Sequence, residues 1–492
     1  MDPLLIEGIA ADAAYRAWET RDARFDGRLF VGVTSTGIYC RPVCRVRLPK
    51  RANMRFYGNA ASAERDGFRP CLRCRPELAP GLSLADSSQT LAEQAALLMR
   101  EAVHGGRAVS VPAIAARLGV TDRHLRRIFQ AAHGVTPIDF LTTQRLLLAK
   151  QLLTDTAEPV TAIAHASGFE SLRRFNAAFA QRYRLSPSAL RREGRPAAAA
   201  AGSGGLRLRL GWRPPYDIAA MLGFLARRPM AGVEAVEGAV WRRTLALPHD
   251  GRLLHGWLVG RFDTERHELQ VEVAPTLAPV LGSVLQRLRL AFDLDADPER
   301  IDAALASLPV PQRAGLRLPG AIDGFETAVR VILGQQVTVK AACTLTQRLV
   351  ERFGMPVDTP FADLRRLFPD ASTLAAADAA DIGTLGIVRQ RVGAIQALAR
   401  AVAAGAIELH RAAPLVATLD ALRALPGIGE WTAQVIAMRA LAWPDAWPAG
   451  DIGLHHALGT RDARRTTELA EAWRPWRAYA VMRLWHHLET SA

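Results

Sequence analysis

The alternation of apolar and polar positions predicts a strand near the start of the chain and helices further along. Residues 28–34 read Arg-Leu-Phe-Val-Gly-Val-Thr, which is typical of a β-strand, and residues 35–44 follow as a turn shaped by Gly37 and Pro42. Charge or proline interrupts every apolar run well before it could span a bilayer. We therefore expect a protein without transmembrane helices.

Helical periodicity is clearest in two stretches that resemble each other. Residues 112–129 place apolar side chains at helical spacing around a turn at Gly119, and residues 160–179 repeat the arrangement. In each stretch a short helix, a glycine turn and a second helix form a helix-turn-helix pattern. The second helices should begin near Asp122 and Ser171.

A third helical signal lies near the end of the chain. Residues 425–433, Leu-Pro-Gly-Ile-Gly-Glu-Trp-Thr-Ala, join two helices through a turn. Gly427 and Gly429 leave backbone groups free to approach a phosphate, directly or through a bound monovalent cation. This is a helix-hairpin-helix pattern. Asp451 follows at the start of another predicted helix, where an isolated aspartate is usually only an N-cap.

Two stretches without periodicity mark boundaries. Residues 79–88 contain turn formers, and residues 195–205 form a Pro/Ala/Gly/Ser linker. The chain should therefore consist of three blocks, 1–78, 89–194 and 206–492. A length of 492 residues is consistent with three or four domains.

Composition and charge narrow the class of protein. The hydrophobic content of 49% is that of a globular protein. Residues 1–10 lack the basic start of a signal peptide and carry Glu7. We therefore expect a cytoplasmic, nucleoid-associated protein without disulfides. Residues 1–76 hold 14 Lys+Arg against 8 Asp+Glu, and residues 89–195 hold 15 against 8, whereas residues 196–492 hold 33 against 30. The positive charge of the first two blocks predicts salt-dependent binding to nucleic acid rather than a merely solubilising surface.

Four of the five cysteines form two close pairs, Cys40 with Cys44 and Cys71 with Cys74. This spacing predicts a tetrahedral zinc site. A structural zinc knuckle would need only the four ligands, but five basic residues crowd the first pair: Arg41, Arg45, Arg47, Lys50 and Arg51. Residues 36–44, Thr-Gly-Ile-Tyr-Cys-Arg-Pro-Val-Cys, and 68–76, Phe-Arg-Pro-Cys-Leu-Arg-Cys-Arg-Pro, resemble the methyl-acceptor domain of the Ada adaptive-response proteins.

That resemblance implies that Cys40 accepts a methyl group from a methylphosphotriester in DNA. One Zn²⁺ would be both structural and activating, since it keeps thiolates deprotonated and four of them leave the site at net −2. Methylation removes one negative charge, so the site repels DNA phosphates less and binds more tightly. We expect one turnover per molecule.

The duplicated helix-turn-helix resembles the AraC-type DNA-binding domain, which implies double-stranded promoter DNA as a partner and RNA polymerase as a possible second one. The candidate DNA contacts in the second helices are Arg123, Arg126, Arg127, Arg173 and Arg174. Arg45 of the first block is a further candidate. Which of them reach bases and which reach phosphates is left open.

The hairpin and the following aspartate resemble the helix-hairpin-helix DNA glycosylases. Residues 212–217 and 221–227 resemble the N-terminal α/β part of the AlkA type, and residues 316–320 and 325–336 resemble its helical core. The match divides the third block into an α/β subdomain, 206–318, and a glycosylase domain, 319–492.

By that resemblance Asp451 is the catalytic carboxylate, Trp431 and Trp485 line the base pocket, and Leu318 lies in the segment that probes the duplex. Val435 departs from the family pattern, which has an aromatic residue there, and this predicts a more open or differently selective pocket. The remaining cysteine, Cys343, lies in an apolar helical stretch and is expected to be buried.

The predicted fold class is multidomain: a small α+β zinc domain, an all-α tandem helix-turn-helix domain, an α+β subdomain and an all-α glycosylase core. The predicted function is an alkylation-response protein that activates transcription and excises alkylated purines such as 3-methyladenine. It would be monofunctional, because lyase-competent relatives place a Schiff-base lysine at the position of Trp431. One alternative is a transcription regulator with an inactive glycosylase-like half, and another keeps the glycosylase but makes the zinc purely structural.

Overall fold

A computed structural model describes residues 5–6, 9–21, 29–44, 46–57, 60–74, 76, 84–106, 109–193 and 204–491. The chain forms two compact units, which are taken one at a time below. The first comprises Met1–Arg100 and Val109–Thr143, and the second comprises Glu101–Ala108 and Gln144–Ala492. Two long helices, α3 (Leu84–His104) and α6 (Pro137–Asp155), contribute to both units.

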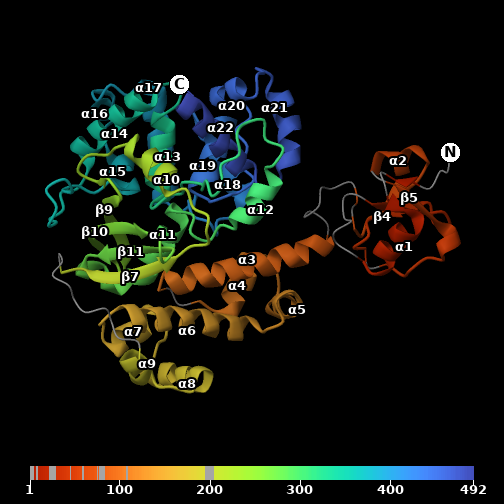
Figure 1. The fold of residues 1–492 in the computed structure, drawn as a ribbon, viewed down its shortest axis with the longest axis horizontal. Coiled ribbons are helices and arrows are strands. Elements are labelled where there is room, and N and C mark those ends of the chain that lie inside the picture. Colours follow the sequence, from red (N-terminus) through yellow and green to blue (C-terminus); the bar gives the residue numbers. More distant parts are fainter. Residues whose placement is uncertain are drawn as a thin grey trace. The chain divides into compact units, whose positions relative to one another are not determined.

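The first unit contains a small mixed sheet, of which β4 and β5 are labelled in Figure 1. The strands follow in the order β5-β3-β4-β6. Strand β3 is antiparallel to β4 and β5, whereas β4 and β6 are parallel. Among the described residues of this part, the remaining elements are a two-stranded sheet, two helices and one 3₁₀ turn. The bounds are β1 (Leu5–Ile6), β2 (Ile9–Ala10), α1 (Ala11–Glu19), β3 (Phe30–Val33), β4 (Ile38–Cys40), η2 (Arg51–Asn53), β5 (Met54–Tyr57), α2 (Ala60–Arg65) and β6 (Arg69–Pro70).

The first helix-turn-helix consists of α4 (Val111–Arg117) and α5 (Asp122–His133). Helix α5 begins at Asp122, as the sequence predicts, because the Thr121 hydroxyl accepts a hydrogen bond from the backbone of His124 at 3.2 Å. The turn between the helices passes through Gly119 at a φ of 68°, a conformation that favours glycine. The helices pack through buried apolar side chains such as Leu125.

The second helix-turn-helix lies in the second unit and consists of α7 (Val160–Ala166) and α8 (Leu172–Tyr183), followed by α9 (Pro187–Glu193). Ser171 caps α8 by accepting a hydrogen bond from the backbone of Arg174 at 3.1 Å, so this helix also begins where the sequence predicts. Phe175 and Phe179 on its inner face are fully buried. Both predicted copies of the motif therefore fold as helical pairs.

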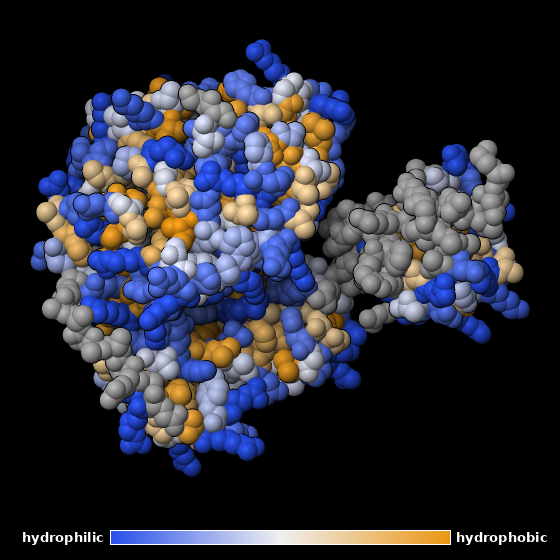
Figure 2. Space-filling view, in the orientation of Figure 1, coloured by the Kyte–Doolittle hydropathy of each residue, from blue (hydrophilic) through white to orange (hydrophobic). Residues whose placement is uncertain are grey.

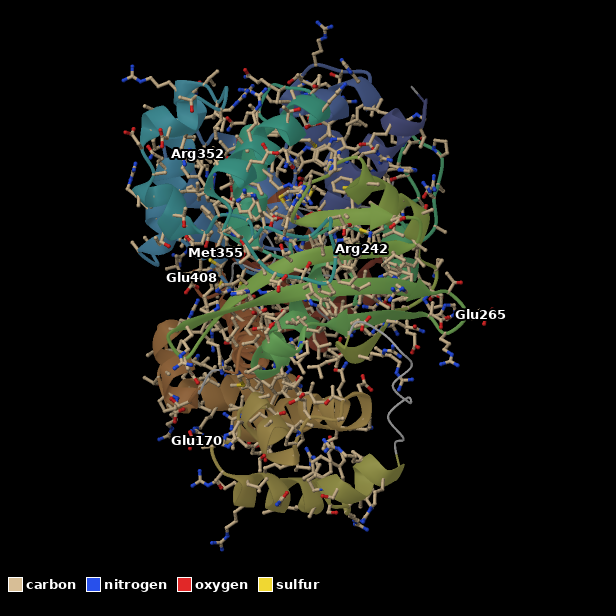
Figure 3. All side chains as sticks on the ribbon, turned by 90° about the vertical axis from the view of Figure 1, so that its left-hand side faces the viewer. Glu170, Arg242, Glu265, Arg352, Met355 and Glu408 are labelled. Carbon is tan, nitrogen blue, oxygen red and sulfur yellow. The ribbon has the colours of Figure 1, made fainter. Side chains whose placement is uncertain are left out.

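An antiparallel sheet in the order β7-β11-β10-β9-β8 opens the rest of the second unit. Figure 3 shows the long strands of this sheet, with Glu265 in the turn between β10 and β11. The bounds are β7 (Leu206–Gly211), α10 (Ile218–Ala226), β8 (Glu234–Glu237), β9 (Val240–His249), β10 (Arg252–Asp263), β11 (Glu268–Val273), η3 (Pro275–Val280), α11 (Leu281–Ala291) and α12 (Pro298–Ala304).

Helices and short turns make up the remainder of the chain, and they enclose one large apolar core. The bounds are α13 (Gly324–Leu333), α14 (Val339–Phe353), α15 (Ala371–Ala376), α16 (Ala379–Gly383), α17 (Arg389–Ala403), α18 (Leu415–Arg423), α19 (Glu430–Arg439), α20 (Ile452–Ala457), α21 (Ala463–Ala470), η4 (Glu471–Trp473) and α22 (Arg477–Ser491). Buried Arg243 of β9 ties the sheet to these helices, since it pairs with Glu326 of α13 at 2.6 Å and with Glu234 of β8 at 3.3 Å.

These elements confirm the predicted fold class. On the face drawn in Figure 2, hydrophobic residues occur in small groups separated by hydrophilic ones. In the described residues, no helix combines the length and the apolar character needed to cross a bilayer. The five-part division of the sequence stays a prediction.

Candidate glycosylase cavity, cysteine cluster and arginine helices

Asp451 stands at the start of α20, where its side chain accepts three hydrogen bonds. One carboxylate oxygen, Oδ1, accepts from the backbone of Leu454 at 3.0 Å and from the indole of Trp485 at 2.9 Å. The other oxygen, Oδ2, accepts from the indole of Trp431 at 2.8 Å. Asp451 is therefore more than the helix cap that its position alone would suggest, because two tryptophans fix its orientation.

The two indoles reach Asp451 from different helices. Trp431 is in the first turn of α19, directly after the glycine turn, and Trp485 is in the middle of α22. A Cβ atom added to Gly453 would lie 3.2 Å from the ring of Trp485 and 3.0 Å from Oδ1 of Asp451. A larger residue here would push the tryptophan or the carboxylate away by a few tenths of an ångström, and the sequence pattern did not single out this glycine.

A cavity of about 360 Å³ opens beside these three side chains. Trp431, Trp485 and Asp451 form one part of its wall. Asp451 is 9% exposed, so its carboxylate is almost enclosed. The volume lies within the range of small-molecule sites. The structure thus brings together the three residues that the sequence predicted for catalysis and base binding.

Most of the remaining lining residues come from α10, α13, α14, α19 and α22, and the others lie in α20 or in the segments that follow α10 and α13. Val435 is among them and is 4% exposed, so the position at which the family pattern has an aromatic residue faces the cavity. Cys343 is also among them and is only partly buried, with its sulfur 4.0 Å from the backbone oxygen of Arg227. The prediction of a buried helical thiol is therefore confirmed for the helix and wrong for the burial of Cys343, because α14 turns this side chain toward the cavity.

The structure places Leu318 in the apolar core of the second unit. It is 5% exposed and packs in the apolar core, and its backbone N–H donates to Asp293 at 3.2 Å. The side chain is thus enclosed here, and the place of Leu318 in the segment that probes the duplex stays a prediction. An exposed loop between α13 and α14 also borders the cavity: Gln336 has a φ of 51° and is exposed, and Val337 lines the cavity at 36% exposure.

The turn that contains Gly427 and Gly429 is hydrogen-bonded to that same loop. Gln335 donates from its side chain to the backbone oxygen of Gly427 and to the hydroxyl of Thr432, both at 2.9 Å. Gly427 has a φ of 78°, and a Cβ atom there would lie 3.0 Å from Ala394. Gly429 caps α19 without a side-chain hydrogen bond, which leaves the first N–H groups of this helix available to an anion.

The four paired cysteines form a cluster in the first unit. Their sulfur atoms all lie within 4.8 Å of one another, and all four residues are buried, with Cys40 2% exposed. Zinc bonds of about 2.3 Å in a tetrahedron separate sulfur atoms by roughly 3.8 Å, so the donor set fits Zn²⁺. Hydrogen bonding with Cys44 and Cys74 raises the pKa of the Cys40 thiol well above its ordinary value, which disfavours the thiolate. A bound divalent cation has the opposite effect, because it lowers the pKa of a thiol that coordinates it.

The candidate arginines differ in how free they are. On α5, Arg123 and Arg127 are exposed, whereas Arg126 is partly buried and its Nε lies 2.8 Å from Asp122. On α8, Arg173 and Arg174 are both exposed. Arg45 lies outside the described residues.

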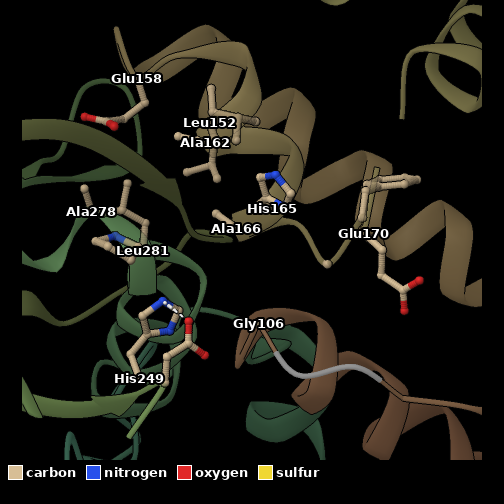
Figure 4. A pocket seen from close by; sticks show the side chains of 15 residues that line it. Gly106, Leu152, Glu158, Ala162, His165, Ala166, Glu170, His249, Ala278 and Leu281 are labelled. Carbon is tan, nitrogen blue, oxygen red and sulfur yellow. Dashed lines mark ion pairs between the residues drawn. The ribbon is translucent and has the colours of Figure 1, made fainter. Parts of the chain in front are cut away.

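A second cavity of about 440 Å³ lies elsewhere in the second unit and shares no lining residue with the first (Figure 4). His165 and Glu158 line it, and His249 pairs there with Asp250 at 3.5 Å. In the part of the chain that the structure describes, no indole donates to the carboxylates of this second cavity. We therefore place the candidate active site at the Asp451 cavity.

Four protein-family models match successive parts of the chain. They are described as the metal binding domain of Ada (residues 13–77), a helix-turn-helix domain (114–193), the AlkA N-terminal domain (207–323) and an HhH-GPD superfamily base excision DNA repair protein (329–477). The cysteine cluster lies within the first match, and Asp451 within the last.

Curated relatives match the same parts. The probable bifunctional transcriptional activator/DNA repair enzyme AlkA of Mycobacterium tuberculosis is 38% identical, over 97% of this chain and 96% of the relative. DNA-3-methyladenine glycosylase 2 of Escherichia coli is 35% identical, over 56% of this chain and 96% of the relative. The bifunctional transcriptional activator/DNA repair enzyme Ada of Escherichia coli is 33% identical, over 32% of this chain and 42% of the relative.

Proposed function

Since the chain belongs to the family of bifunctional transcriptional activators and DNA repair enzymes that join an Ada-type metal-binding domain to an AlkA-type glycosylase, we propose that it excises alkylated purines such as 3-methyladenine at Asp451. We further propose that it accepts methyl groups from DNA methylphosphotriesters on Cys40 and thereby becomes a transcriptional activator.

The observation that carries the glycosylase assignment is the carboxylate of Asp451, held by two indoles at the wall of a base-sized cavity. An alkylated purine is already cationic and leaves readily once it is flipped out of the duplex. The enzyme must then stabilise the positive charge that develops on the sugar, which the carboxylate of Asp451 does. The rings of Trp431 and Trp485 stack on the flipped cation, worth on the order of 1 to 2 kcal/mol.

The cavity also supports a monofunctional reaction. Among the described residues that line it there is no lysine, so no amine is at hand to form a Schiff base with the sugar. Trp431 occupies the position at which lyase-competent relatives carry that lysine. The product is then an intact abasic site. A duplex with one 3-methyladenine should lose the free base yet remain unbroken until alkali is added. Binding without base release would instead favour a regulator with an inactive glycosylase half.

Three features near the cavity grip the duplex in this proposal. The open N-terminus of α19 at Gly429 binds a phosphate, and the turn around Gly427 holds a monovalent cation that helps to bind it. The exposed loop at Gln336 and Val337 contacts the duplex together with the segment around Leu318, because this loop stands at the rim of the cavity. Side chains at such a rim fill the gap left by a flipped base.

Cys40, Cys44, Cys71 and Cys74 hold one Zn²⁺, which supplies the charge that keeps the thiolates deprotonated. The sulfur of Cys40 attacks the methyl carbon of the phosphotriester, a sulfur–carbon bond forms, and the phosphodiester leaves as an anion. The thioether carries no charge, so the cluster loses one negative charge and DNA binding tightens. The activator then contacts promoter DNA through α5 and α8 and recruits RNA polymerase.

The exposed arginines of α8 provide a test of the DNA-binding surface. Arg173→Ala should weaken binding to a promoter duplex and reduce the slope of log affinity against log salt by about 1, because one phosphate contact is lost. Arg126→Ala should change the slope less, because that guanidinium is already paired with Asp122. Fluorescence anisotropy over a salt series measures both. Equal effects of the two changes would contradict the assignment.

The thiol of Cys343 provides a test of the cavity. A maleimide on this partly exposed side chain would fill space beside Asp451, so base release should fall several-fold after treatment. The Cys343→Ala variant should lose this sensitivity, which separates the effect from reaction at the four clustered cysteines. Undiminished release from the wild type, with Cys343 shown by mass spectrometry to be modified, would place the base elsewhere.

A further inference from the structure

One face of α19 lines the cavity between Trp431, whose indole donates to Asp451, and an arginine near the end of the helix. Trp431, Val435 and Arg439 follow one another at intervals of four residues, which places them on the same side of the helix, and all three line the cavity. Helical side chains lean toward the N-terminus of their helix, so the guanidinium of Arg439 extends back toward Trp431. Val435 lies between these two residues on this side of the helix and presents only a short side chain there.

Arg439 is held at the cavity wall with most of its donors uncommitted. Its Nε donates to the backbone oxygen of Pro319 at 3.1 Å, and its guanidinium carbon lies 5.0 Å from the ring centre of Phe224. In the described part of the chain it has no ion pair and no other hydrogen bond, so its terminal N–H groups remain for a ligand. Burial, followed by the charges of Arg330 and Arg228, lowers the pKa of Arg439 to about 9, which leaves it charged at neutral pH.

The two neighbouring arginines of the cavity are committed elsewhere. Arg228 pairs with Glu489 at 3.2 Å, and its guanidinium carbon lies 3.8 Å from the ring centre of Phe224. Arg330 pairs with Glu326 at 3.3 Å and donates to the backbone oxygen of Arg228 at 2.9 Å. Arg439 is thus the guanidinium of this group that is free to recognise a base.

We infer that Arg439 determines specificity by binding the acceptor edge of the flipped base, so that this cavity favours 6-oxopurine lesions over 6-aminopurine lesions. A guanidinium carries only donors, and it pairs in bidentate fashion with the O6 and N7 acceptors of guanine. The 6-amino group of a 6-aminopurine is itself a donor. When it faces the guanidinium, N–H groups of the base and of Arg439 are left unpaired. Val435 makes this contact accessible, because an aromatic ring at that position would stand between the base and Arg439. The inference rests on the proposed glycosylase function.

The test compares release of 3-methylguanine and 3-methyladenine from methylated DNA, two cationic bases that carry the methyl group on the same atom. Single-turnover rates for both are measured by chromatography of the released bases. Arg439→Met keeps the aliphatic stem and removes the donors, and it should lower the ratio of the 3-methylguanine rate to the 3-methyladenine rate on the order of ten-fold. Val435→Tyr should lower the ratio in the same direction while leaving the arginine in place. Arg465→Met, at an exposed arginine of α21, should leave the ratio unchanged.

The outcomes separate the inference from its premise. One outcome is that Arg439→Met lowers the release rates of both bases by the same factor while Val435→Tyr leaves their ratio unchanged. In that case Arg439 only supports the fold, and the inference is overturned. If Arg439→Met melts at a much lower temperature and loses all activity, Val435→Tyr alone decides. If the wild type releases neither base, the proposed glycosylase function itself fails. If the wild type releases both bases and the ratio does not move in either variant, only the specificity of Arg439 is refuted.

Discussion

Asp451→Asn is expected to lower the single-turnover rate of base release by roughly 10²- to 10³-fold. The affinity for DNA should change little. The amide has nearly the shape of the carboxylate and can still cap α20 by accepting from the backbone of Leu454. It has no negative charge to place beside the developing cation on the sugar. It also turns an N–H group toward one of the two indoles that now donate to Asp451.

A matched control for this change lies one helix further along. Asp462 caps α21 by accepting from the backbone of Arg464 at 2.8 Å and is exposed outside the cavity. Asp462→Asn therefore makes the same substitution at the same kind of cap and should leave base release unchanged. If Asp451→Asn and the control behave alike, the carboxylate has no part in the reaction and the regulator with an inactive half is favoured.

Cys40→Ala should abolish methyl transfer to the protein entirely, because no other sulfur is proposed to accept it. Wild-type protein incubated with DNA that carries methylphosphotriesters should gain one methyl group, located by mass spectrometry on the peptide with Cys40. Base release should continue in this variant, since Asp451 lies in the other compact unit. The measurement thus separates loss of the acceptor from general loss of the protein.

Controls for this change use the remaining cysteines. Cys343→Ala keeps the cluster intact and should accept methyl at the wild-type rate. Zinc content should be measured for each variant, because Cys40→Ala also removes a ligand. A methyl group found on Cys44, Cys71 or Cys74 of the wild type would refute the choice of Cys40, and an unmethylated wild type would make the zinc purely structural.

Local sequence patterns predict much of the site because several functional residues lie within one short motif. The paired cysteines come from two turns of one small sheet, and both helix-turn-helix copies show their helix starts through Thr121 and Ser171. Trp431 follows the glycine turn directly. Contacts of this kind depend on a few neighbouring residues, so spacing alone conveys them.

The features that the sequence did not predict depend on tertiary packing. The motif around Leu318 does not convey that Asp293 holds the backbone of this residue and that its side chain packs in the core. The apolar stretch around Cys343 suggested burial, yet which face of α14 turns toward the cavity depends on helices distant in sequence. The closeness required at Gly453 likewise becomes evident only once Trp485 of α22 is placed beside it.

The most direct test of the whole account follows labelled methyl groups from DNA through the purified full-length protein. The account predicts label in two places: on the protein, lost in Cys40→Ala, and as free methylated base, lost in Asp451→Asn. Each variant should keep the activity that the other loses. Label that reaches neither place, or that reaches both places in both variants, would contradict the account.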